Sequence, residues 1–137
     1  MNDDGYSVEK TITKGVKRVK GKNEKVFARG DIYYCDLRAD AGSVQRGYRP
    51  VVIIQNDTGN RFSPTLIVTP ITTIIKKEQL PTHVIMGKGF GLRNESMVLL
   101  EQIHTVDKLA QIGDYVGSIS KAVMTKIDNA LRLSVGL

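Results

Sequence analysis

Two side chains that can bind a phosphate stand at the ends of apolar segments. Arg49 directly precedes the apolar run that begins at Pro50, and Thr72 follows the apolar run over residues 65–71. An arginine guanidinium makes charge-assisted hydrogen bonds to phosphate, often two at once, and a threonine hydroxyl can donate or accept beside it. Together they could hold a phosphodiester and stabilise charge that develops on it. The same residue types also suit purely structural roles in a strand and at a strand edge.

Other kinds of catalytic site have less support in the sequence. His83, His104 and Cys35 occur in none of the spacings typical of zinc sites. The chain has neither a Gly-x-x-x-x-Gly-Lys-[Ser/Thr] nucleotide loop nor a Gly-x-Ser-x-Gly nucleophile turn. The spacing leaves open an acid–base pair of His83 and His104, although a histidine on a strand is more often structural or solvated. We expect no metal and no cofactor.

The composition fits a single basic domain. A chain of 137 residues can bury a real core, and its net charge of +6 favours a polyanionic partner. Residues 1–25 read as a basic extension, either flexible or an arm that touches nucleic acid, and residues 26–137 as the folded domain. The single cysteine fits a reducing compartment, and neither a secretory signal nor a membrane-length apolar run is evident. We therefore expect a cytoplasmic protein with no membrane association.

Apolar runs and turn residues predict a mainly β fold that ends in a helix. Ser120 can cap this helix and Gly136 can end it. Residues 56–64 are rich in turn residues and should form a connection. A small closed or half-closed barrel with the helix packed on it is the simplest arrangement. The predicted strands cover residues 30–37, 50–55, 65–71, 82–86, 97–106 and 111–116.

A glycine-bounded loop should position Arg49. Gly42 and Gly47 bracket a loop that carries Arg46. Pro50 biases the preceding residue toward an extended backbone and suits the first position of a strand. Arg49 should therefore sit at the mouth of a strand, where its guanidinium can meet an anion.

Five segments of the chain, taken together, resemble the MazF/PemK family of toxin endoribonucleases, and the similarity is to its Gram-positive branch. They keep the family's order from about Arg29 to the C-terminus, and residues 1–25 lie outside them. The segments are residues 29–33 (Arg-Gly-Asp-Ile-Tyr), 47–57 (Gly-Tyr-Arg-Pro-Val-Val-Ile-Ile-Gln-Asn-Asp), 59–65 (Gly-Asn-Arg-Phe-Ser-Pro-Thr), 80–84 (Leu-Pro-Thr-His-Val) and 99–103 (Leu-Leu-Glu-Gln-Ile).

The resemblance implies an SH3-like β-barrel of the MazF/PemK/CcdB type with a C-terminal helix, usually a homodimer. It implies metal-independent cleavage of single-stranded mRNA at short sequences, by attack of the ribose 2′-OH on the adjacent phosphate. The family's catalytic arginine falls on Arg49 and its catalytic threonine on Thr72. Because arginine stays protonated in proteins, we expect Arg49 to stabilise charge and Thr72 to orient the phosphate.

One loop position departs from the family. Many members carry Gly-Ser-Glu-Gln where this chain has Val44, so a mechanism that uses this glutamate as a base cannot operate here. The general base is therefore left open. RNA contacts are also left open for His104, which could equally be a solvated residue at a strand end, and for Tyr48, for which a core or dimer role is an equal alternative. The residues that the resemblance implies for RNA recognition are Ser43, Gln45, Arg46, Asn56 and Gln102.

The resemblance also implies a partner, a cognate MazE-like antitoxin whose acidic, disordered tail covers the RNA groove. A chain of net charge +6 is compatible with such a partner. Two alternatives stay open. The same barrel could be a toxin without nuclease activity that binds a protein such as gyrase through its C-terminal helix, or a nucleic-acid-binding barrel without activity.

Overall fold

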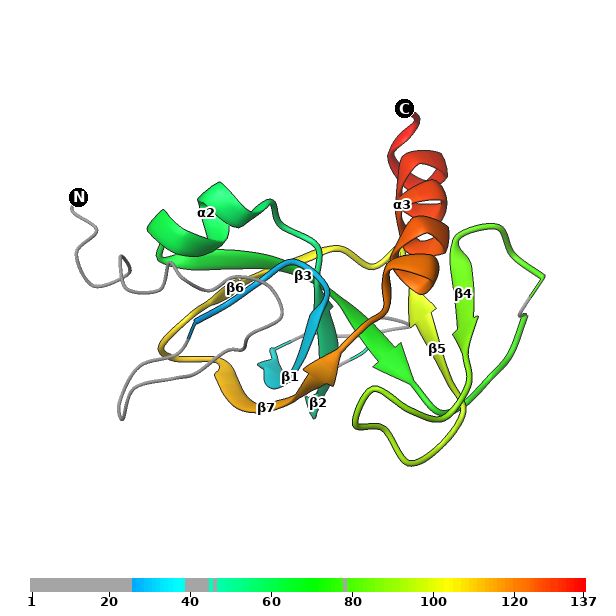
Figure 1. The fold of residues 1–137 in the computed structure, drawn as a ribbon, viewed down its shortest axis with the longest axis horizontal. Helices are drawn as coiled ribbons and strands as arrows, with labels where there is room; N and C mark the ends of the chain where they lie inside the picture. Colours follow the sequence, from blue (N-terminus) through cyan, green and yellow to red (C-terminus); the bar gives the residue numbers. More distant parts are fainter. Residues whose placement is uncertain (1–25, 39–44, 46, 78) are drawn as a thin grey trace.

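The computed structural model describes residues 26–38, 45, 47–77 and 79–137, and the description below concerns these residues. They form a mainly antiparallel β structure with a helix at its C-terminal end (Figure 1). The strands are β1 Asp31–Leu37, β2 Gly47–Ile53, β3 Thr65–Thr72, β4 His83–Met86, β5 Ser96–Leu99, β6 His104–Asp107 and β7 Ile112–Ser118, and the helices are α2 Asp57–Phe62 and α3 Lys121–Val135.

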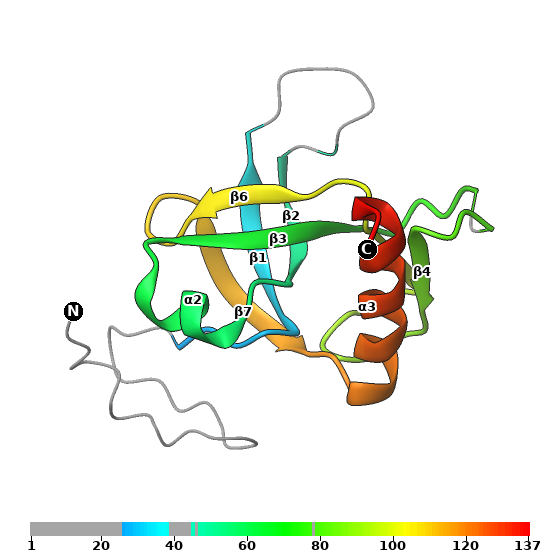
Figure 2. The ribbon, with the colours of Figure 1, turned by 90° about the horizontal axis from the view of Figure 1, so that it is seen from above.

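The strands are ordered β4-β5-β3-β2-β1-β7, and β6 also pairs with β3. The long strand β3 takes part in three pairings. Its first half pairs with β6, its middle with β2, and its last residues, Ile71 and Thr72, with β5. Because β3 pairs with β6 and β2 along most of its length and with β5 at its end, the sheet folds over on itself into a partly open barrel. Figure 2 shows β1 and β2 side by side, crossing beneath β3 and β6.

Two apolar clusters lie on opposite faces of β1 and β2. Val51 and Ile53 belong to the barrel core, with residues of β1, β3, β6 and β7, whereas Val52 and Ile54 belong to the core that faces α3. Successive residues of a strand point to opposite faces, so a strand covered on both faces needs an apolar side chain at every position. The continuous apolar run after Pro50 is thereby explained, and its prediction as a doubly buried strand is confirmed.

Helix α3 begins and ends as its sequence predicts. The Ser120 hydroxyl accepts a hydrogen bond from the Val123 N–H at 3.3 Å, and Gly136 ends the helix at φ +78°, where glycine is favoured. Ile127 and Ala130 are buried against the sheet. Figure 1 shows α3 standing beside β4 and β5.

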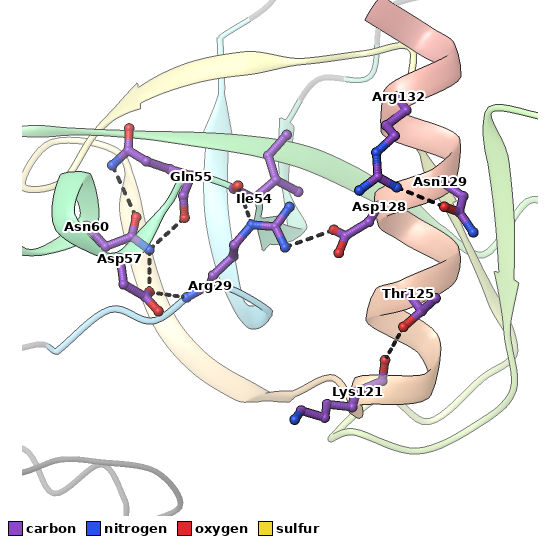
Figure 3. Close-up of polar contacts among 10 residues, drawn as sticks. All are labelled: Arg29, Ile54, Gln55, Asp57, Asn60, Lys121, Thr125, Asp128, Asn129 and Arg132. Atoms are coloured by element: carbon purple, nitrogen blue, oxygen red, sulfur yellow. Dashed lines mark hydrogen bonds and ion pairs between the residues drawn. The ribbon is translucent and has the colours of Figure 1, made fainter. Parts of the chain in front are cut away.

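Arg29 fastens α3 to the barrel. Its Nε donates to the Ile54 carbonyl oxygen at 2.8 Å, and its Nη1 forms an ion pair with Asp128 of α3, also at 2.8 Å (Figure 3). Its backbone N–H donates to Asp57 at the start of α2. The Arg29 side chain thus joins the segment before β1 to the residue after β2 and to the middle of α3.

Two expectations about the elements are wrong. Residues 97–106 form two strands, β5 and β6, rather than one, because the chain turns after Leu99, whose carbonyl accepts from the Gln102 N–H at 3.1 Å. The described residues therefore hold seven strands, where six were expected. Residues 56–64 contain helix α2, since the turn residue Asn56 also serves as a helix cap and accepts from the Gly59 N–H at 2.8 Å.

Candidate active site

The strand register directs Arg49 and Thr72 to the same side of neighbouring strands. The pairing of β2 with β3 runs from Ile53 with Val68 to Val51 with Pro70. Arg49 lies two residues before Val51, and Thr72 lies two residues after Pro70. If this register is continued past its last printed pair, the two positions come opposite each other, on the face to which Val51 and Pro70 point. They stand where β3 leaves β2 to pair with β5.

The surroundings of the two side chains suit different tasks. Arg49 is partly buried and lies opposite Cys35 on β1. Thr72 is 5% exposed, and its hydroxyl oxygen accepts a hydrogen bond from the Ile74 N–H at 3.0 Å. Because this bond uses an oxygen lone pair, the Thr72 hydroxyl keeps its proton available to donate in a fixed direction. The site can therefore offer a partly buried cation and an oriented hydrogen-bond donor.

The structure brings together two of the residues expected to recognise RNA. The Gln45 backbone N–H donates to the side-chain oxygen of Gln102 at 2.8 Å. Gln102 lies in the turn between β5 and β6, so this bond joins the approach to β2 to that turn. Ser43 and Arg46, which were expected to act beside them, lie outside the described residues, as does Val44.

Asn56 lies away from this group, beyond the far end of β2. Its side-chain oxygen caps α2, and the residue lines a groove of about 530 Å³ between the end of β2 and the last turns of α3. Ile54, Ile103 and Leu131 also line this groove. The structure therefore gives Asn56 a local structural role and separates it from Arg49 by most of the length of β2.

The sequence left the roles of Tyr48 and His104 open, and the structure places these two residues in different environments. Tyr48 is 59% exposed, which excludes a core role for it. His104 pairs with Val68 across β6 and β3, and its Nε2 atom is buried without a hydrogen-bond partner among the described residues. Burial lowers the pKa of His104, because it disfavours the charged imidazolium.

The histidine that sequence spacing left as an acid–base candidate has another partner. His83 Nε2 lies 2.8 Å from a Glu101 carboxylate oxygen, and its Nδ1 lies 3.0 Å from the Lys77 carbonyl oxygen. Both ring nitrogens thus face groups other than His104. The Thr82 hydroxyl donates to the other oxygen of Glu101 at 3.1 Å. These contacts hold Glu101 in place next to Gln102. No local sequence motif predicts the contact between His83 and Glu101, because the two residues are 18 positions apart.

Low pH should weaken the contact between His83 and Glu101, and comparison with the variant Glu101→Gln should measure the stability that is lost. Burial raises the pKa of Glu101, but hydrogen bonds from His83 and Thr82 and the positive charge of His83 together bring it below its usual value. A lowered carboxyl pKa stabilises the fold above the unfolded-state pKa of about 4.3, and that stability is lost as pH falls through the folded-state pKa. Because the side chain is 40% exposed, the effect should be about 0.5 kcal/mol.

Urea unfolding between about pH 3 and pH 7 measures this effect. The stability difference between the original chain and Glu101→Gln should shrink as pH falls below about 4. The exposed Glu95→Gln serves as the matched control. A difference that stays constant over the whole range would contradict this role for the Glu101 carboxylate.

The remaining candidates for metal or nucleophilic chemistry are poorly placed. In the described part of the chain no three metal-binding side chains from His, Cys, Asp and Glu gather together. Cys35 is buried, and burial raises the pKa of its thiol to about 12, with a smaller contribution from Asp36. Such a thiol is not a nucleophile near neutral pH. None of the helices within the described ranges is long and apolar enough to cross a membrane.

Comparison with known proteins agrees with this fold. The chain is 49% identical over 113 residues to the Endoribonuclease EndoA of Bacillus subtilis, covering 82% of this chain and 97% of the relative. It is 51% identical, also over 113 residues, to the Endoribonuclease MazF of Staphylococcus epidermidis, covering 82% and 93%. A solved mycobacterial endoribonuclease in complex with its cognate antitoxin matches with a TM-score of 0.65 and 33% identity, covering 80% of this chain and 95% of that chain.

The fold expected from the sequence resemblance, an SH3-like barrel of the MazF/PemK type with a C-terminal helix, is thus confirmed. The family model for PemK-like, MazF-like toxins of type II toxin–antitoxin systems matches residues 28–135. That match spans nearly all of the chain after its basic N-terminal segment. The protein therefore belongs to the PemK-like, MazF-like family of type II toxins.

Proposed function

We propose that this protein is the toxin of a toxin–antitoxin pair and acts as an endoribonuclease on single-stranded mRNA. The observation that carries the proposal is the register of β2 and β3, which when continued by two residues directs Arg49 and Thr72 to the same side, within a chain that is about half identical to proteins named endoribonucleases. The substrate class follows from the chemistry of the pair, because a guanidinium and a hydroxyl together suit a phosphodiester. The excess positive charge favours a polyanion as well.

The ribose 2′-OH would attack the adjacent phosphorus, and the bond from phosphorus to the 5′ oxygen of the next nucleotide would break; the 2′-OH proton passes to solvent water, and water returns one to the leaving 5′ oxygen. The products are one fragment with a 2′,3′-cyclic phosphate and one with a 5′-OH. Arg49 would bind the phosphate oxygens and stabilise their added negative charge. Thr72 would donate a hydrogen bond to one of these oxygens, since its own oxygen already accepts from the Ile74 N–H.

Arg49 does not serve as the base in this mechanism, because a guanidinium stays protonated. Val44 cannot accept a proton either. The proposed acceleration therefore comes from charge stabilisation and from fixing the phosphate in line for attack, not from a carboxylate in the loop. No step needs a metal ion.

Recognition of the RNA sequence is proposed for Ser43, Gln45, Arg46, Asn56 and Gln102. Unpaired RNA bases can be read along their edges by such side chains and by the backbone. The bond between Gln45 and Gln102 supports a shared recognition surface next to Arg49. Asn56 would contact RNA only at some distance from the scissile phosphate, since it lies past the opposite end of β2.

An acidic antitoxin of the MazE type is the proposed protein partner. The mycobacterial relative was solved in complex with its cognate antitoxin. An acidic chain would complement the charge of +6 and compete with RNA for the same basic surface. We further propose a cytoplasmic homodimer in which residues 1–25 form a flexible extension outside the toxin domain at residues 26–137.

The purified protein should cut single-stranded RNA in the presence of EDTA, and sequencing the 5′ ends of the fragments should reveal one short recurring sequence. The new 5′ ends should carry a hydroxyl, which is measured by labelling with polynucleotide kinase without prior phosphatase. Salt-dependent RNA binding without any product would instead indicate an inactive nucleic-acid-binding barrel. Inhibition of gyrase with intact RNA would favour the toxin without nuclease activity.

A further inference from the structure

Two stacked tyrosine side chains are exposed to solvent near the candidate active site. The rings of Tyr34 on β1 and Tyr48 on β2 are stacked, with centroids 5.2 Å apart and planes 17° from parallel. Tyr34 is 36% exposed and Tyr48 is 59% exposed. Large aromatic side chains usually bury most of their surface, so a stacked pair with this much exposure is a feature to explain.

The ring of Tyr48 lies across the sheet and is held in place there. A Cβ atom on Gly113 of β7 would come within 2.1 Å of the Tyr48 hydroxyl oxygen and 2.9 Å of the adjacent ring carbon. Because β1 lies between β2 and β7, the Tyr48 side chain spans β1 to reach Gly113. The absence of a side chain at Gly113 thus makes room for the ring, and Tyr34 supports one of its faces.

The pair lies one residue from Arg49, on the opposite side of the strand. Neighbouring residues of a strand point to opposite faces, so Tyr48 and Arg49 are on either side of β2. The pairing of β2 with β3 begins only at Val51, whereas the pairing with β1 extends to Gly47. Along residues 47–50 the edge of β2 that faces β3 is therefore not paired with β3, and an RNA strand held at Arg49 can cross this edge and bring its next bases to Tyr48.

The local charge favours a base over a phosphate at this position. Asp36 lies opposite Tyr48 in the register, and its carboxylate forms an ion pair with Arg38 at 3.2 Å. Because Arg38 is paired with Asp36, its positive charge is already neutralised and attracts a phosphate less, whereas an uncharged base needs no cation here. Every base has a flat π face that can stack on an aromatic ring, and such stacking contributes substantially to single-strand binding.

We propose that Tyr48, supported by Tyr34 and seated over Gly113, stacks an unpaired base of the RNA next to the scissile phosphate. The inference rests on the proposed nuclease function and adds a binding position to it. A held ring loses little conformational entropy on binding, so the supporting contacts should raise affinity.

The test uses a short single-stranded RNA that carries 2-aminopurine and a 2′-deoxy sugar at the cleavage position, so that binding is measured without cutting. Tyr48→Ala should weaken binding about 5- to 100-fold and abolish the quenching of 2-aminopurine that stacking causes. Tyr48→Phe keeps the ring and should bind like the original chain. Gly113→Ala leaves the ring intact but displaces it, and should fall between these two.

The matched control is Leu133→Ala, because Leu133 is 60% exposed on α3, which carries none of the residues of the ring pair. Unchanged binding and quenching in Tyr48→Ala would overturn the inference. So would weaker binding that sedimentation traces to a lost dimer, since the pair would then belong to a contact between two copies of this chain. An original chain that binds with Tyr48-dependent quenching but cuts no RNA would contradict only the nuclease proposal.

Discussion

Replacing Arg49 by alanine should slow RNA cleavage at least about 100-fold while leaving the protein folded. Removal of one preorganised donor to a developing oxyanion typically costs a factor of about 100 to 1,000 in kcat, and a guanidinium that contributes both charge and hydrogen bonds should be at least as important. Arg49→Lys keeps the charge but loses the paired hydrogen bonds, so it should retain an intermediate rate. Initial rates on a fluorogenic RNA, in EDTA, measure both variants.

Two variants of Thr72 complete this prediction. Thr72→Ser keeps the hydroxyl and should stay active, whereas Thr72→Ala should lose activity and about 1 kcal/mol of stability, because the Ile74 N–H loses its acceptor. Thermal unfolding shows whether each variant is still folded at the assay temperature. Full cleavage activity in folded Arg49→Ala and Thr72→Ala would refute the proposed site.

The sequence predicted the parts of this site that depend on local pattern. Pro50 and the apolar run after it indicate a buried strand, but β2 begins earlier, at Gly47, so Arg49 lies within the strand and not at its mouth. Ser120 and Gly136 mark the two ends of α3, because capping depends on residues within one helical turn. The predicted strands and helix indicated a small barrel, and the order of the five resembling segments then indicated the family.

The structural features that the sequence did not predict depend on contacts between residues that are distant in the chain. Turn residues at 56–64 are compatible with both a turn and a capped helix, and the buried side chain of Asn60 decides for the helix through its bonds to Gln55. The apolar run at 97–106 reads as one strand until its two halves take different partners, since β5 pairs with β3 and β4, and β6 with β3 alone among the described strands. The contacts of His83 with Glu101 and of Tyr48 with Gly113 join segments with no shared local pattern.

A second large effect should come from two glycines at the place where the loop before β5 packs on β7. A Cβ atom on Gly117 would lie 2.0 Å from the Phe90 carbonyl oxygen, and one on Gly91 would lie 2.1 Å from the Val116 carbonyl oxygen. Both obstacles are backbone atoms, so the two segments would have to separate. Gly91 also has φ +90°, a backbone conformation that alanine adopts only with strain.

Gly117→Ala should therefore lower the free energy of unfolding by about 2 kcal/mol, and Gly91→Ala by about 3 kcal/mol, because strain adds to overpacking. Chemical denaturation measures both values. Gly87→Ala is the matched control, since no atom lies within 4 Å of its Cβ position and its φ is not positive. Equal unfolding midpoints for Gly91→Ala and Gly87→Ala would contradict the close packing of this loop on β7.

These glycine variants also separate stability from catalysis. Gly91 and Gly117 lie on the loop before β5 and on β7, whereas the candidate catalytic pair lies on β2 and β3. Below its unfolding temperature, Gly117→Ala should thus cleave RNA at the normal rate per folded molecule, and folded Arg49→Ala should not. If the two variants lost activity in proportion to their loss of folded protein, the effect of Arg49 would be structural, and the guanidinium would have no part in the chemistry.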